Sequence, residues 1–125
     1  IGEARRLRKL FGGAMRQAGY LAAAGLYALE HHVDRLAEDH ARARAVAAEL
    51  ASLPWVSEVL PVETNVVICL LEPSLAPSRV IERLAAHEVR ASSMGGRTLR
   101  FVFHLQVDDA ALERLRAILR RVEPR

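Results

Sequence analysis

The chain has 125 residues, of which 51% are hydrophobic and 26% charged, and its formal net charge at neutral pH is +3. Its length allows one domain with a real core, and it has neither an apolar run near the roughly 20 residues that cross a membrane nor a leader-like start, so we expect a soluble, cytoplasmic protein without membrane contact. The basic charge does not predict a nucleic-acid partner, because the arginines alternate with acidic residues along the expected helices and the aromatic residues are too few for base stacking.

The first motif along the chain is the glycine pair Gly12-Gly13, which follows Lys9 and precedes Arg16. Backbone amides at a helix N-terminus attract anions, glycine lets an anion approach closely, and arginine adds a charge-assisted hydrogen bond. These residues therefore form a candidate phosphate cradle. The spacing matches no standard phosphate-binding fingerprint, so an ordinary turn is the alternative.

A long apolar helix is expected next, from about Ala14 to His31, after a short basic segment over residues 3–10. The helix is rich in alanine and leucine nearly all round, so it requires cover on most sides, and its alanines permit close approach of another backbone. This chain is too short to supply that cover. We therefore expect the helix to be buried by a partner domain or subunit.

The remaining sequence predicts a small α+β domain with a largely antiparallel sheet covered by helices. The expected order after the Ala/Leu helix is helix, strand, strand, helix, strand, strand, helix. Asp34 is the expected N-cap of the first of these helices and Asp108 that of the last, and Gly95-Gly96 form the turn between the last two strands. The expected ranges are 34–52, 55–60, 64–71, 77–87, 89–93, 98–104 and a final helix after residue 108.

Arg100 is a charge in an expected strand, flanked by Leu99, Phe101 and Val102. An unpaired charge in such apolar surroundings costs several kcal/mol, so Arg100 requires an anionic partner. That partner is either a bound ligand or a structural glutamate elsewhere in the sheet. Arg97 is more typical of a turn residue, and takes the place of Arg100 if the strand register differs from the expected one.

The single cysteine and the histidines predict no catalytic or metal site. Cys69 lies in an apolar run over residues 66–71, so we expect a buried thiol, and no intrachain disulfide is possible. His31 and His32 at a helix end favour an interaction with the helix dipole, and no cysteine or carboxylate completes a metal-binding set with them.

Four segments of the chain carry a family resemblance: residues 9–19, 36–40, 64–65 and 100–104. They resemble the low-specificity L-threonine aldolases, which are pyridoxal-phosphate enzymes of the aspartate-aminotransferase fold type (fold type I). Residues 9–19 are similar to the stretch that opens the C-terminal part of these enzymes. Residues 36–40 resemble the family's helical Arg-Leu-x-Glu-Asp-His stretch, and Thr64-Asn65 the residues that lead into its buried strand. Residues 100–104 look like its Arg-x-Val-x-His strand. The four segments follow the family's order over essentially the whole chain.

The resemblance implies a domain organisation and an activity. Residues 1–33 would be a phosphate-loop segment and an interface helix linked to an upstream cofactor domain, and residues 34–125 the small C-terminal α+β domain. A start at Ile1 fits a piece of a longer protein. That protein would be a homo-oligomer, dimer or tetramer, that cleaves L-threonine or a related β-hydroxy-α-amino acid to glycine and an aldehyde.

The resemblance also carries over cofactor-binding residues. Arg16 and Lys9, with Gly12 and Gly13, match the positions that reach the phosphate of pyridoxal 5'-phosphate, across the subunit boundary of these oligomers. Ala14 stands where a third glycine is common. The family's Schiff-base lysine lies upstream, in a sequence context that does not occur here, so this chain contains no catalytic residue and is expected to be inactive alone.

Arg100 matches the family's arginine that pairs with the substrate α-carboxylate, with Arg97 as the fallback. Phe103 stands where a threonine usually precedes the histidine, which puts the substrate preference in doubt. Two alternatives stay open. One is another fold type I lyase, such as a phenylserine aldolase or a β-eliminating lyase. The other is a non-catalytic α+β domain that binds a partner helix through its Ala/Leu surface.

Overall fold

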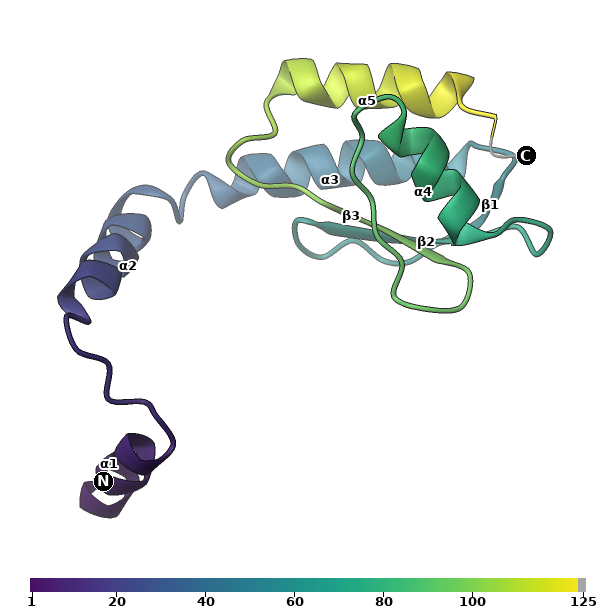
Figure 1. Cartoon of the computed structure of the whole chain (residues 1–125). Coiled ribbons are helices and arrows are strands. Elements are labelled where there is room, and N and C mark those ends of the chain that lie inside the picture. The colour runs from purple at the N-terminus through teal and green to yellow at the C-terminus, as the bar shows by residue number, and fades with distance from the viewer. Residues whose placement is uncertain (124–125) are drawn as a thin grey trace. The chain divides into compact units, whose positions relative to one another are not determined.

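The computed structural model describes residues 1–123 and separates the chain into two units, Ile1–Asp34 and a unit that begins at Arg35 (Figure 1). The first unit holds helices α1 (Gly2–Leu10) and α2 (Gly19–His31). Neither helix has a buried residue. No helix in the described part of the chain is long and apolar enough to cross a membrane.

Helix α1 was not expected from the sequence, and α2 starts later than predicted. The basic segment forms a helix because arginine, leucine and lysine all have high helix propensity. The Ala/Leu helix begins at Gly19 and not near Ala14, because Gln17 has a φ of 53°, which a right-handed helix does not contain. Its large apolar side chains are exposed, as for Leu21 (63%) and Leu29 (69%), so the first unit by itself does not give this helix the expected cover.

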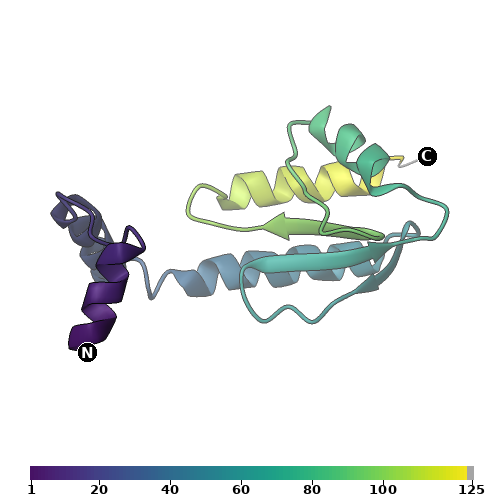
Figure 2. The same ribbon diagram turned by 60° about the horizontal axis from the view of Figure 1, so that its bottom comes forward.

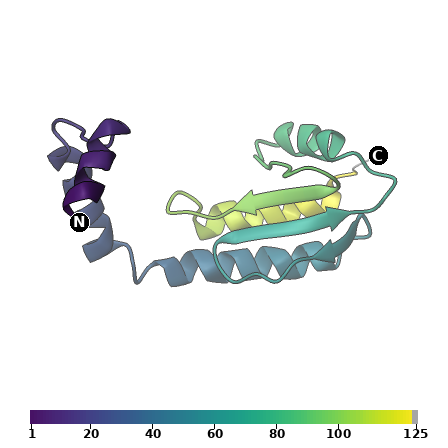
Figure 3. The same ribbon diagram turned by 90° about the horizontal axis from the view of Figure 1, so that it is seen from below.

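The second unit contains a three-stranded antiparallel sheet in the order β1-β2-β3. Figures 1, 2 and 3 together show the helices of this unit on one side of the sheet, with the strands in front when the unit is viewed from below. The α+β class and the antiparallel pairing are confirmed. The elements are α3 (Leu36–Ala51), β1 (Val56–Val59), β2 (Val66–Leu71), α4 (Pro77–Ala85), β3 (Thr98–Val102) and α5 (Asp109–Arg121).

Two local predictions for the second unit were wrong. The segment 89–93 forms only an isolated bridge between Ser92 and Arg100, not a strand. Hydroxyl groups redirect the backbone there: Thr98 Oγ1 accepts from the Met94 amide at 2.9 Å, and Ser93 Oγ accepts from the Gly95 amide at 3.2 Å. At the start of α3, Asp34 is not the N-cap, because the helix begins at Leu36 and has no side-chain cap.

Other local predictions agree with the structure. Asp108 caps α5 by accepting a hydrogen bond from the Ala111 amide at 2.7 Å. The core lies between the sheet and the helices, and Cys69 is fully buried in it, where burial raises the pKa of its thiol to about 11. Core side chains include Ala43, Val46, Leu50, Val67, Leu71, Val80, Leu84, Leu99, Phe101 and Leu119.

Phe103 also belongs to this core, with 2% of its surface exposed. Buried and less buried residues alternate along β3, so Leu99 and Phe101 face the helices while Arg100 lies on the other face. Phe103 continues the buried series. Phe103, which departs from the family pattern, therefore packs in the core, and its expected effect on the substrate preference stays a prediction.

Helices α3 and α5 are joined by an ion-pair cluster around Glu49, a carboxylate that is 8% exposed. Arg120 donates to it from Nε and Nη2, both at 2.6 Å, and Arg116 donates from Nε at 3.2 Å. The hydrogen bonds from Arg120 and the one from Arg116 outweigh the opposing effect of burial and lower the pKa of Glu49 below its ordinary value. The cluster stabilises the packing of α5 on α3 while Glu49 is ionised.

Replacing Glu49 by glutamine is expected to lower the free energy of unfolding by about 1 to 2 kcal/mol near neutral pH, because the charge-assisted hydrogen bonds from Arg120 and Arg116 become weaker. A lowered folded-state pKa gives stabilisation that is complete above about pH 4.3, the unfolded value, and is lost as the pH falls through the folded value. Urea denaturation at pH 7 and at pH 3 should show that Glu49→Gln removes this pH dependence. Glu82→Gln is the control, since its 3.7 Å pair with Arg79 is exposed. Equal effects of both changes would contradict the assignment.

Candidate functional site

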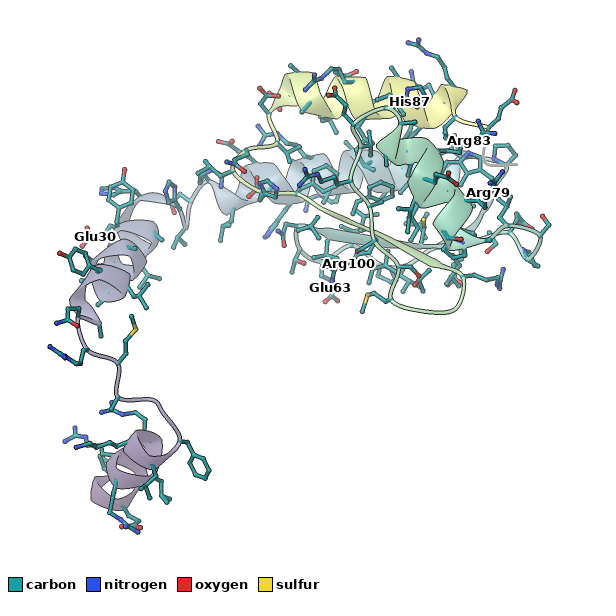
Figure 4. All side chains as sticks on the ribbon, in the orientation of Figure 1. Glu30, Glu63, Arg79, Arg83, His87 and Arg100 are labelled. Atoms are coloured by element: carbon teal, nitrogen blue, oxygen red, sulfur yellow. The ribbon has the colours of Figure 1, made fainter. Side chains whose placement is uncertain are left out.

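The face of the sheet opposite the helices carries Arg100, the middle residue of the edge strand β3. Its neighbours on this face are the alternate residues of β2 and β3, and Ile68 is the register partner of Arg100. Figure 4 shows Arg100 on the side of the sheet away from α5. The side chains that share this face with it are Val66, Ile68, Leu70, Thr98 and Val102.

The backbone of Arg100 is fully hydrogen-bonded, whereas its side-chain Nε is not. Its amide donates to the Ser92 carbonyl at 2.7 Å, and its carbonyl accepts from the Ser92 amide at 3.1 Å. Its Nε is buried and has no hydrogen-bond partner among the described residues. Within residues 1–123 no carboxylate forms an ion pair with Arg100. The structural-glutamate alternative thus has no support in this part of the chain, and a buried orphan donor requires an acceptor.

A shallow pocket of about 250 Å³ lies beside Arg100, lined also by Arg90, Ser92 and His104. The lining contains arginine and histidine side chains and no acidic residue. Nδ1 of His104 accepts a hydrogen bond from the Gln106 amide at 3.3 Å, so a neutral ring carries its proton on Nε2, where it can be donated. The charged and ring groups of the pocket therefore offer donors, which suits an anionic ligand.

Arg97 is engaged with the end of β2. Its Nη1 donates to the Leu71 carbonyl at 2.6 Å, and its own carbonyl accepts from the Leu71 amide at 2.9 Å. The guanidinium of Arg97 is therefore bound to the backbone of Leu71. Arg97 itself lies three residues before Arg100. Its expected role as the fallback carboxylate ligand stays a prediction.

The glycine pair of the first unit ends helix α1. Gly12 has a φ of +80°, and its amide donates to the Lys9 carbonyl at 3.2 Å, while the Gly13 amide donates to the Arg8 carbonyl at 2.8 Å. This is the Schellman arrangement of a helix C-terminus. A Cβ on Gly13 would lie 2.6 Å from Arg8 Cγ and 2.9 Å from Arg8 O, so the turn requires glycine there. The ordinary-turn alternative thus accounts for both glycines.

Because both glycine amides donate to α1, the side chains around them are the groups left for an anion. Lys9 lies in the last turn of α1, and Arg16 lies in the connection to α2. Both are exposed. Cationic amine and guanidinium groups fit a phosphate ester, with arginine suited to bidentate contact. Their expected cofactor role stays a prediction, as does that of Gly12 and Gly13.

One polar residue of the sheet was missed by the sequence interpretation. Nδ2 of Asn65 donates to the Phe103 carbonyl at 2.5 Å, which ties the start of β2 to the end of β3. The only signal in the sequence was an asparagine directly before an apolar strand. Among the described residues, no group of three or more histidine, cysteine, aspartate or glutamate side chains is placed to hold a metal ion.

Comparison with known proteins gives one family. The family described as beta-eliminating lyase matches residues 1–73. A relative named probable low-specificity L-threonine aldolase, from Schizosaccharomyces pombe, is 37% identical over 125 residues, which is 100% of this chain and 31% of that protein. The low specificity L-threonine aldolase of Escherichia coli (strain K12) is 48% identical over 65 residues, 52% of this chain and 19% of that protein. The chain thus spans about a third or less of these relatives.

Solved structures agree on the fold. An ornithine aminotransferase from Toxoplasma gondii, whose active site is partially occupied by PLP, matches 79% of this chain and 24% of its own, with a TM-score of 0.60 and 19% sequence identity. A second structure of the ornithine aminotransferase from Toxoplasma gondii gives a TM-score of 0.56 over 69% of this chain and 22% of its own, at 19% identity. At this identity the likeness shows a shared fold.

Proposed function

The chain belongs to the beta-eliminating lyase family, and we propose that it is the C-terminal part of a pyridoxal-phosphate-dependent aldolase. The complete enzyme cleaves L-threonine, or a related β-hydroxy-α-amino acid, to glycine and an aldehyde. Relatives named as low-specificity L-threonine aldolases support this substrate class. The break between the two units at Asp34 supports a first part, residues 1–33, that joins a cofactor domain, and a small C-terminal domain after it.

The observation that carries the proposal is the orphan donor of Arg100. Its Nε is buried without a partner among the described residues, on an open sheet face beside a pocket with cationic lining. The planar guanidinium binds a carboxylate bidentately, and such a contact fixes the orientation of an amino acid about Cα. Arg100 is therefore assigned to the substrate α-carboxylate.

Pyridoxal phosphate, when bound, supplies the electron sink that stabilises the negative charge left on Cα when a bond to it breaks. The residues of this chain provide charge and orientation. Arg16, assisted by Lys9, neutralises the phosphate group, and Arg100 holds the carboxylate so that the bond from Cα to Cβ is the one that breaks. The lysine that forms the Schiff base with the cofactor in this family lies outside this sequence.

The apolar surface of α2 supports an oligomer. Leu21, Leu26 and Leu29 are 63%, 59% and 69% exposed in this chain. Apolar side chains exposed together on one element mark an interaction surface. We assign its cover to the upstream domain or to a second subunit, whose phosphate site Arg16 reaches.

An absorbance experiment on the intact enzyme tests the proposal. With pyridoxal phosphate added, we expect a visible band of the bound cofactor that changes when L-threonine is added and glycine and acetaldehyde form. The 125-residue chain alone should give neither the band nor the products. An intact protein that binds no cofactor would overturn the assignment and leave the interaction-domain alternative.

The second candidate, a β-eliminating lyase, is favoured by the description of the matched family. L-Serine separates the two reactions, because aldol cleavage yields glycine and formaldehyde whereas β-elimination yields pyruvate and ammonia. We expect glycine to dominate. Pyruvate as the main product would reassign the reaction and leave the role of Arg100 unchanged, since both reactions start from the same carboxylate contact.

A further inference from the structure

The two ends of the β2–β3 pair are closed by side chains in the same way. At one end, the Phe103 amide donates to the Asn65 carbonyl at 2.8 Å, and Asn65 Nδ2 donates to the Phe103 carbonyl at 2.5 Å. In a regular antiparallel pair both bonds come from backbone amides. Here a side-chain amide donates to the carbonyl that the backbone amide would otherwise bind.

The other end repeats this arrangement with arginine. The Leu71 amide donates to the Arg97 carbonyl at 2.9 Å, and Arg97 Nη1 donates to the Leu71 carbonyl at 2.6 Å. The regular ladder runs from the pair Val66↔Val102 to the pair Leu70↔Thr98. The two side-chain bonds thus lie one pair beyond the ladder at each end.

Arg100 sits midway between these two ends, three residues after Arg97 and three before Phe103. Strand residues alternate between faces, so a slip of β3 by one residue would turn Arg100 toward the core and bring an apolar neighbour to the open face. On the edge of β3 that does not pair with β2, Arg100 forms two backbone hydrogen bonds with Ser92. Among the described residues, these are the only backbone hydrogen bonds on that edge at Arg100. The register of β3 therefore decides whether the guanidinium reaches a ligand.

We propose that Asn65 and Arg97 are positioning residues, which lock the register of β3 and hold Arg100 on the open face. This inference rests on the proposed function, because it assumes that Arg100 binds the substrate carboxylate. It also changes the expected role of Arg97: its guanidinium binds the backbone of β2 and does not contact the substrate. Asn65, noted in the sequence only as part of the approach to a strand, gains a positioning role behind the carboxylate contact of Arg100.

The test uses the intact enzyme with Asn65→Ala, Asn65→Asp, Arg97→Ala and Arg97→Lys, beside Arg100→Ala and the control Thr64→Ala. Kinetic constants for L-threonine and hydrogen–deuterium exchange of the segment 98–104 are measured on each. We expect Asn65→Ala and Arg97→Ala to raise KM about tenfold, while kcat stays within about threefold of the wild-type value. A loss of this size is what a small displacement of a binding group produces. Exchange of the segment should accelerate in the same two variants.

The conservative variants sharpen the test. Arg97→Lys keeps a donor near Leu71 and should restore most of the wild-type KM. Asn65→Asp places a carboxylate oxygen against the Phe103 carbonyl and should be at least as impaired as Asn65→Ala. Thr64→Ala should match the wild type. A structural role alone would lower the amount of active enzyme, seen as a lower apparent kcat at unchanged KM.

Three results would overturn the inference. The first is an unchanged KM in Asn65→Ala and Arg97→Ala when Arg100→Ala raises it, which leaves the proposed function intact. The second is a raised KM in Arg97→Ala without faster exchange of the segment 98–104, which would make Arg97 a direct ligand. The third is an unchanged KM in Arg100→Ala itself, which would remove the carboxylate site and with it the proposed role of Arg100.

Discussion

Replacing Arg100 by alanine in the intact enzyme is expected to reduce kcat/KM for L-threonine by about a thousandfold, and replacing it by lysine by about a hundredfold. A hydrogen bond to a charged group contributes about 1.5 to 3 kcal/mol, and a bidentate contact has two of them. Lysine keeps the charge but loses the planar fork and its second contact. Steady-state kinetics on cofactor-saturated enzyme measure both effects.

Competitive inhibitors can separate the carboxylate contact from general damage to the fold. In Arg100→Lys, an amino acid that binds without reacting should lose affinity, whereas the matching amino alcohol, which has no carboxylate, should bind as it does to the wild type. Arg79→Lys, on the exposed surface of α4, is the matched control and should change the affinity for neither inhibitor. Equal losses for both inhibitors would show that Arg100 does not bind the carboxylate.

The position of Arg100 was predictable because it depends on a local pattern. One charge within the run Leu99–Val102 has to lie on one face of a strand, and alternation places it opposite Leu99 and Phe101. The role of Asn65 was not predictable in the same way. Its partner, Phe103, is 38 residues away, and only the sheet register brings the two together.

The glycine pair shows how a missed element changes the interpretation of a motif. Without helix α1 in the prediction, Gly12-Gly13 looked like the approach to a following helix, and hence like a phosphate cradle. With α1 present, the same two amides close its C-terminus. The positive φ of Gln17 prevents α2 from starting before Gly19. Lys9 therefore lies at the end of α1, and Arg16 lies in the connection before α2.

Replacing Arg16 by alanine in the intact enzyme is therefore expected to raise the dissociation constant of pyridoxal phosphate by about ten- to a hundredfold, the loss of one charge-assisted phosphate contact. Lys9→Ala should have a smaller effect, because an ammonium makes a single, strongly hydrated contact. Absorbance titration of the cofactor-free enzyme measures the constants. Arg5→Ala, an exposed arginine of α1 outside the motif, is the control.

The same titration distinguishes the side chains from the glycine turn that precedes them. Gly12→Ala introduces a side chain at a φ of +80°, so it should act by loosening the end of α1, with a lower thermal midpoint and a modest change in cofactor affinity. Arg16→Ala should have the opposite pattern: the affinity for the cofactor falls, while the thermal midpoint of the cofactor-free enzyme stays at the wild-type value. If Arg5→Ala weakened the cofactor as much as Arg16→Ala, the effect would come from general positive charge, and the assignment of Arg16 to the phosphate would be wrong.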